Sequence, residues 1–223
     1  MCPVGDLFAR VHRYTGRMSV SRVIPANEYR RERWKNGAGW TREIIAVCPC
    51  EFAGKPACSG ACRGFAYRLS IAEIESDAAF SRFDGIDREL VLLSGNGLRL
   101  RFDDGESHTL LPPHQRLRFA GERALVGELV DGPTQDFNLM WRRDTVVARL
   151  WHRPLVGSML VFVEPGTTWA VHLIAGQARF ADGSGLADLL AGDTALLQAG
   201  STRARYALDG GGEALLMQLQ PRP

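Results

Sequence analysis

The chain has 223 residues, of which 45% are hydrophobic, so one large domain or two small ones can bury a core without disulfides. Lys and Arg number 27 against 25 Asp and Glu, and the resulting charge of +2 gives no global field that would attract nucleic acid or an anionic membrane. No apolar stretch reaches the roughly 20 residues of a membrane-spanning helix, and no secretion signal is recognisable, so we expect a cytoplasmic protein whose partners are small molecules or proteins.

The first 17 residues, MCPVGDLFARVHRYTGR, show no regular pattern, and organised sequence starts at Met18. We expect residues 1–17 to form a disordered extension, with translation from an upstream start codon as the alternative explanation for them. A short helical turn is predicted within Ile24 to Trp34. It leads into RWKNGAGWTREI at positions 33–44, where two glycines precede a strand predicted from Thr41 to Val47.

A cysteine-rich segment, CPCEFAGKPACSGAC, follows this strand and contains Cys48, Cys50, Cys58 and Cys62. Its Gly, Ala and Pro content is typical of a loop. Four thiolates would complete a tetrahedral zinc shell, but the spacing C-x-C-x7-C-x3-C lacks the paired C-x2-C of common zinc sites. We therefore interpret residues 47–64 as an inserted loop. The alternative is that its cysteines form a metal-binding or redox-active site.

Short apolar runs separated by Gly and Pro continue to the end of the chain, and sustained helical periodicity is absent. One helical turn is expected at 185–190. A strand-like run covers Asp136 to Met140, and further strands are predicted at 65–74, 90–93, 98–102, 116–119, 124–129, 158–163, 170–174, 195–198 and 214–220. Because no helix is long enough to serve as a crossover, the strands must pair antiparallel, and the fold class is all-β.

A weak internal repeat divides these strands into two sets. LVLLSGNGLRLRF at 90–102 resembles WAVHLIAGQARF at 169–180, and LLPPHQRLRFAG at 110–121 resembles LLAGDTALLQAG at 189–200. Each unit has a strand, a tight turn at Gly95 or Gly176, and a returning strand. Since closing a sheet removes its edges, we predict two tandem antiparallel barrels, at 18–143 and 144–223.

Polar residues share one face of three predicted strands, opposite apolar neighbours. The pairs are Thr41 with Glu43, Arg68 with Ser70, and Asp136 with Asn138. A solvated sheet face would explain them, and so would a pocket in a barrel mouth. In the pocket interpretation the Arg, amide and hydroxyl groups bind a carboxylate, and the acids receive a cationic nitrogen.

Three long stretches of the sequence resemble the HutD/Ves family of bacterial bicupins associated with histidine utilisation. They are RWKNGAGWTREI, FAYRLSIAEIESDAAFSRFDGIDRELVLLSGNGLRL and DGPTQDFNLMWRR. The resemblance runs from about Met18 to the C-terminus, and LLAGDTALLQAG is similar to the second motif of cupins. It implies two cupin-like jelly-roll barrels and a small-molecule pocket that senses urocanate or formiminoglutamate, with a regulatory effect on histidine utilisation.

Cupin barrels commonly hold a metal through several histidines and a glutamate, and this sequence departs from that pattern. Its histidines are His12, His108, His114, His152 and His172, with no His-x-His among them. A metal site needs several side chains that converge on one point. We therefore expect neither a metal nor another cofactor in the barrel centre.

The predicted ligand-binding set has eight members, with Arg68 as the first choice for a carboxylate: Lys35, Asn36, Thr41, Glu43, Arg68, Ser70, Asp136 and Asn138. No catalytic residue is assigned. The alternative is a cupin-type isomerase or hydrolase acting on a small carboxylate, with Glu43, Asp136 or His172 as acid/base candidates. An interface at exposed Trp141, Trp151 and the Arg142–Arg143 pair and a homodimer stay open, whereas nucleic acid and membranes are not expected as partners.

Overall fold

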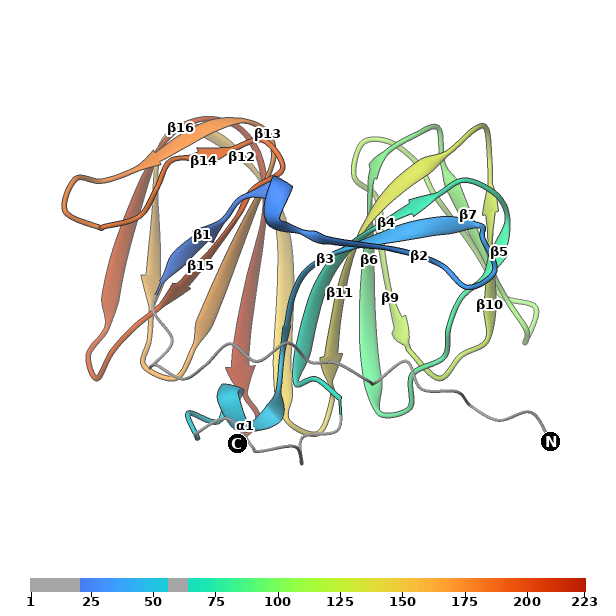
Figure 1. The fold of residues 1–223 in the computed structure, drawn as a ribbon, viewed down its shortest axis with the longest axis horizontal. Coiled ribbons are helices and arrows are strands. Elements are labelled where there is room, and N and C mark those ends of the chain that lie inside the picture. Colours follow the sequence, from blue (N-terminus) through green and yellow to red (C-terminus); the bar gives the residue numbers. More distant parts are fainter. Residues whose placement is uncertain (1–20, 56–63) are drawn as a thin grey trace.

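The computed structural model describes residues 21–55 and 64–223, which form two antiparallel β-barrels side by side (Figure 1). The expected extension at 1–17 lies outside the described residues, as do Cys58 and Cys62 of the cysteine-rich segment. Among the helices of the described part, none has the length and apolar character required to cross a membrane. The all-β prediction and the pair of cupin-like barrels are confirmed.

Two sheets face each other in the first barrel. The larger has the strand order β2 (Arg30–Arg33), β3 (Gly39–Val47), β4 (Tyr67–Ile74), β11 (Thr134–Arg142), β6 (Ile86–Ser94) and β9 (Arg116–Ala120). The smaller has the order β5 (Ala78–Ala79), β10 (Leu125–Leu129), β7 (Leu98–Phe102) and β8 (Ser107–Leu110). Leu90, Leu92, Leu98 and Phe102 belong to the apolar core between the sheets.

One sheet builds the second barrel. Its order is β1 (Arg22–Ile24), β15 (Thr194–Gln198), β13 (Thr168–Phe180), β16 (Ala204–Pro221) and β12 (Val146–Val163), with β14 (Leu189–Leu190) beside β13. Strand β1 comes from the beginning of the chain and pairs Arg22 with Leu196. The second sheet is therefore completed by the first described strand.

The contact between the barrels is a second apolar core, and it explains the alternation along β4 and β11. Tyr67, Leu69 and Trp141 project from one face of these strands and belong to the same buried cluster as Leu150 and Leu215 of the second barrel. The opposite face points into the first barrel. Trp141 is 1% exposed, so the prediction that it forms an exposed interface is wrong.

The predicted strands are confirmed, but several are longer than the sequence indicated. Strands β12 and β16 have 18 residues each and include Pro154 and the glycines at 210–212, which look like breaks. Strand β12 lies at the edge of its sheet, where the missing N–H of a proline is tolerated. The helical turn predicted at 185–190 is wrong, because 185–188 has no regular structure and 189–190 forms β14. The one predicted within 24–34 is wrong for most of its length, because 30–33 forms β2.

Two local features differ from the sequence interpretation: the short helical segments near the start of the chain and the backbone at Gly176. Within Ile24 to Trp34 the only helical part is the 3-10 turn η1 (Ala26–Glu28), and a short helix, α1 (Pro49–Phe52), begins at the cysteine-rich segment after Cys48. Gly176 makes no turn. Strand β13 continues through it with a φ of 90°, opposite Gly212, because glycines on both strands let the backbones approach closely.

Candidate functional site

A cavity of about 440 Å³ lies in the first barrel. Its wall is made by β2, β3, β4, β6 and β11, by the loop after β2 and by the segment at 79–83, and it contains seven of the eight predicted site residues: Lys35, Asn36, Thr41, Glu43, Arg68, Ser70 and Asn138. A hollow of about 570 Å³ runs along β13, β14 and β16 in the second barrel. None of the buried polar atoms that lack partners in the described part of the chain lies on that second wall, so the first cavity is the better candidate.

Strand register brings the polar side chains together. Arg68 lies opposite Met140, and Ser70 lies opposite Asn138 on one side and Glu43 on the other. Met140 in turn lies opposite Arg88 of β6. Directly opposed residues point to the same face of a sheet, so period-two alternation carries all of them into the barrel.

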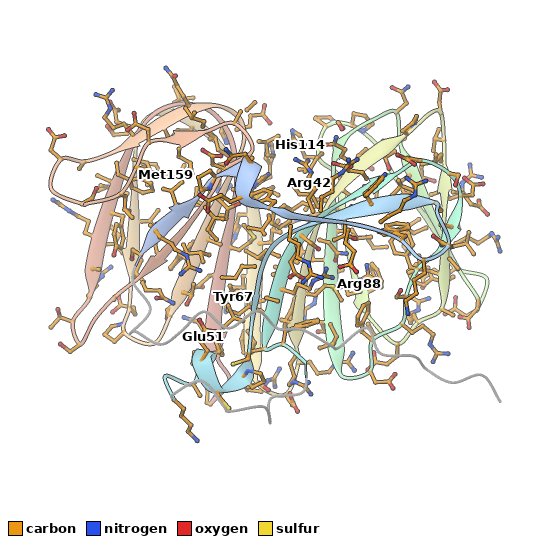
Figure 2. The ribbon with its side chains drawn as sticks, viewed as in Figure 1. Arg42, Glu51, Tyr67, Arg88, His114 and Met159 are labelled. Carbon is orange, nitrogen blue, oxygen red and sulfur yellow. The ribbon has the colours of Figure 1, made fainter. Side chains whose placement is uncertain are left out.

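Arg88 is the most unusual group on this wall. Its side chain lies inside the first barrel (Figure 2) and the residue is 4% exposed. The guanidinium carbon is 5.3 Å from the ring centres of Phe80 and Phe119 and 5.8 Å from that of Phe83. Its Nη1 donates a hydrogen bond of 3.3 Å to the Ser81 carbonyl, while Nε has no partner among the described residues.

The charge of Arg88 is poorly compensated. Aromatic faces attract a cation but supply no negative charge, and no carboxylate of the described residues forms an ion pair with it. Burial, and then the positive charge of Arg68, lower the pKa of Arg88 to about 9. A buried cation without an anion is a costly arrangement that an incoming carboxylate would relieve.

Arg68, the first choice from the sequence, already has a counter-ion. Its Nε donates to Oε2 of Glu43 at 2.6 Å, and both side chains are largely buried, with 20% and 29% exposed. Glu43 therefore neutralises Arg68. Arg88, which also lies on the cavity wall, was not among the eight residues predicted from the sequence.

The signal for Arg88 was present in the strand pattern. Its neighbour Asp87 forms ion pairs with Arg118 at 2.7 Å and Arg143 at 2.9 Å, and not with Arg88. Consecutive strand residues point to opposite faces. Arg88 therefore shares the inward face of Ile86 and Leu90, both buried.

The remaining wall residues offer hydrogen-bonding groups. Asn138 is 7% exposed, and its Oδ1 lacks a partner among the residues described. Trp34 donates from Nε1 to Oγ1 of Thr41 at 2.8 Å and meets Phe80 edge-on at 6.2 Å. In the loop, Oδ1 of Asn36 accepts from the Ala38 amide at 3.1 Å, which holds the turn next to the cavity.

Asp136 is the predicted site residue that the structure does not place on the wall. It shares the face of Asn138 but lies deeper, opposite Ala72 and Leu92, and it is fully buried. Its Oδ2 accepts from Oγ1 of Thr134 at 3.1 Å, and burial raises its pKa to about 7.

The acid/base candidates of the enzyme alternative do not converge. His172 is a buried residue of β13 in the second barrel, with Nδ1 3.0 Å from Oγ1 of Thr194. Burial lowers its pKa to about 3, and it does not line the cavity. Glu43 is paired with Arg68, and Asp136 lies behind the wall.

Several known proteins are similar to this chain. A 21.2 kDa protein from the hutC 3' region of Pseudomonas putida, described as uncharacterized, is 38% identical over 133 residues, and protein Ves of Escherichia fergusonii is 37% identical over 118 residues. These matches cover 60% and 52% of this chain, and they span only 64% and 56% of the length of those relatives.

Solved structures cover more of the chain. The structure of HutD from Pseudomonas fluorescens SBW25, in a formate condition, has a TM-score of 0.73 and 29% identity, and the match covers 90% of this chain and 98% of that one. A conserved protein of unknown function from Pseudomonas aeruginosa PAO1 gives a TM-score of 0.76 at 28% identity, over 92% of this chain and 100% of that one. The HutD family model matches residues 26–216. Because this match spans most of the sequence, both barrels included, the chain belongs to the HutD family.

Proposed function

We propose that the first barrel binds a small carboxylate-bearing molecule and that the protein thereby senses an intermediate of histidine breakdown. The observation that carries this proposal is Arg88, a buried guanidinium that faces a cavity and has no ion-pair partner in the described part of the chain. A carboxylate would accept hydrogen bonds from its N–H groups and supply the missing charge. The aromatic rings of Phe80, Phe83 and Phe119 hold the cation in place for that contact.

The cavity also suits a second polar group on the same ligand. A volume of about 440 Å³ lies within the usual range of small-molecule pockets. Oδ1 of Asn138 accepts hydrogen bonds only, and it has no donor among the described residues. A ligand with a carboxylate for Arg88 and an N–H for Asn138 would satisfy both groups.

Urocanate and formiminoglutamate both have this pair of features, a carboxylate and a nitrogen that bears hydrogen. Membership of the HutD family links the chain to histidine utilisation, and a relative lies in the hutC 3' region of Pseudomonas putida. We propose that binding of one of these intermediates tunes histidine utilisation.

A calorimetric titration with urocanate, formiminoglutamate and the uncharged amide of urocanate tests the proposal. We expect one of the two acids to bind and the amide to bind at least about tenfold more weakly, since loss of a charged hydrogen bond of 1.5–3 kcal/mol changes affinity by at least that factor. A bound ligand at a hundredfold excess over its Kd raises the free energy of unfolding by about 2.7 kcal/mol, which gives an independent thermal readout.

Arg88→Met is the decisive variant, because Met fills a similar volume without the charge. It should fold at least as well as the parent, since an uncompensated buried charge is removed, and it should lose acid binding. Arg101→Met is the matched control, because Arg101 is exposed and pairs with Glu128 at 2.6 Å. Undiminished binding by Arg88→Met, or no binding of either acid by the parent, would refute the proposal. Chromatographic analysis of the incubated acids separates sensing from turnover.

A further inference from the structure

Three potential metal ligands meet outside the cavity, where the barrels touch. His114 lies in the connection between β8 and β9, His152 on β12 and Glu213 on β16, and one donor atom from each lies within 4.8 Å of the others. Figure 2 places His114 between the two barrels. The first ligand therefore comes from one barrel and the other two from its neighbour.

Both imidazole rings approach the same carboxylate oxygen of Glu213. Nε2 of His114 is 3.0 Å from Oε2 of Glu213, and Nε2 of His152 is 2.8 Å from the same atom. The two imidazole rings are 4.7 Å apart between their centres. All three residues are partly buried, so the cluster is accessible to an ion from solvent.

The hydrogen bonding of His114 defines what its Nε2 can do. Nδ1 lies 3.1 Å from the carbonyl oxygen of Leu92, and because a carbonyl only accepts, the proton is assigned to Nδ1. In a neutral ring Nε2 then presents a lone pair, and this lone pair faces a carboxylate oxygen that also only accepts. Two acceptors at 3.0 Å repel each other unless a positive charge lies with them.

The backbone at His114 supports a dedicated role for this ring. Its φ is 53°, and it is the only non-glycine residue with a positive φ in the described part of the chain. Such conformations concentrate at functional sites, where the surrounding structure maintains them. Here the conformation presents the imidazole of the first barrel to Glu213 of the second.

We propose that His114, His152 and Glu213 form a binding site for a divalent transition-metal ion, with zinc as the best match. Two imidazole nitrogens and one carboxylate oxygen are a common zinc ligand set, and water or an anion occupies the fourth position. The contact of Nδ1 with a backbone carbonyl is the outer-shell arrangement that orients histidine ligands toward metals. This site is separate from the cavity, whose wall includes none of the three residues.

Two of the three ligand separations, those to Glu213, need little change to admit the ion, and all three ligand atoms lie within 4.8 Å of one another. Ligand atoms about 2.0–2.1 Å from a tetrahedral zinc ion lie about 3.3 Å apart. The distances of 3.0 Å and 2.8 Å to Oε2 of Glu213 are therefore short by a few tenths of an ångström. The Glu213 side chain is 45% exposed and that of His152 is 33% exposed, so both have space to move apart.

The competing explanation is a proton in place of the metal, which would make His114 an imidazolium ion in a salt bridge. Measuring zinc bound to the full chain distinguishes the metal ion from the proton. The protein is first stripped with a chelator and then dialysed against zinc. We expect the parent to bind one equivalent more than Glu213→Gln or His152→Ala, with zinc raising the thermal midpoint of the parent but not of these variants. Glu213→Gln is nearly isosteric, so it reports ligation in a folded chain.

His108→Ala is the matched control, because His108 also pairs with a glutamate, Glu106, but belongs to no cluster of potential metal ligands among the described residues. It should bind as much zinc as the parent. A cobalt spectrum distinguishes this site from the cysteine-rich segment, since thiolate ligands give intense charge-transfer absorption and nitrogen and oxygen ligands do not. Equal zinc content in the parent, Glu213→Gln and His152→Ala would overturn the proposal and leave the proton as the shared cation.

Discussion

The buried carboxyl of Asp136 makes the stability of the first barrel depend on pH. It is fully buried, accepts one hydrogen bond from Thr134, and its second oxygen has no partner among the described residues. Burial raises its pKa from 3.8 to about 7, with the Thr134 hydrogen bond acting in the opposite direction. The folded protein therefore holds a proton on Asp136 that the unfolded chain releases at much lower pH.

The sign and size of the effect follow from this difference. Between pH 3.8 and about 7 the native state binds more protons than the unfolded state, so the free energy of unfolding falls as pH rises through that range. The pKa difference between 3.8 and about 7, at about 1.36 kcal/mol per pKa unit, lowers the free energy of unfolding by roughly 4 kcal/mol, and this loss is complete above pH 7. Asp136→Asn replaces the carboxyl with a neutral group of the same shape. The variant should be more stable than the parent by up to that amount at pH 8, and no more than slightly different below pH 4.

Urea denaturation of parent and Asp136→Asn at intervals from pH 4 to 8 measures the difference directly. Taking the difference between the two proteins removes the titration of all other groups. Asp182→Asn, at an exposed position, is the control and should follow the parent at every pH. If the parent and Asp136→Asn curves run parallel across the range, Asp136 is not a buried acid with a raised pKa.

Three further outcomes are expected. Glu43→Gln removes the 2.6 Å partner of Arg68 next to Arg88, so acid binding by calorimetry should strengthen severalfold; weaker binding would mean that Glu43 contacts the ligand. Gly176→Ala should cost more than about 3 kcal/mol in urea denaturation, because its Cβ would lie 1.9 Å from the Gly211 carbonyl oxygen. Gly166→Ala, also at positive φ but in open space, should cost only about 1–2 kcal/mol, and equal costs would contradict the close approach. Trp34→Phe should lose most of any fluorescence change on acid binding, since Trp34 lines the cavity; an undiminished change would assign the response to another tryptophan.

Most of the fold was predictable from the sequence because alternation and turn residues are local signals. The polar and apolar faces of β4 follow from period two alone, and the structure puts Arg68 and Ser70 inward and Tyr67 and Leu69 toward the second barrel. What local signals could not give is the continuity of the long strands. The glycines at 210–212 resemble a turn in sequence, and only their position opposite β13 explains them as a place where two strands cross closely.

Most residues of the site were predictable from the sequence, but the ion pairs between their side chains were not. Alternation identified the wall residues on β3, β4 and β11, but the strand predicted at 90–93 stopped short of Arg88, because β6 begins at Ile86. Which guanidinium is already neutralised depends on contacts between strands, such as the one from Arg68 to Glu43 across 25 positions. The cluster of His114, His152 and Glu213 is likewise invisible in sequence, because its members come from two barrels.

The pairing of β1 with β15 affects how the chain folds while it is being synthesised on the ribosome. Ser21, the residue before β1, donates a hydrogen bond to the carbonyl of Gln198, which is 177 residues later in the chain. At a synthesis rate of 5–20 residues per second, β1 therefore waits roughly 9–35 s for its partner strand β15. Once Arg142 has been synthesised the first barrel has all its own strands, whereas the growing second sheet keeps an open edge, which invites association with other chains, until β15 is made. Removing Arg22–Ile24 would leave the edge of the second sheet at β15 permanently open.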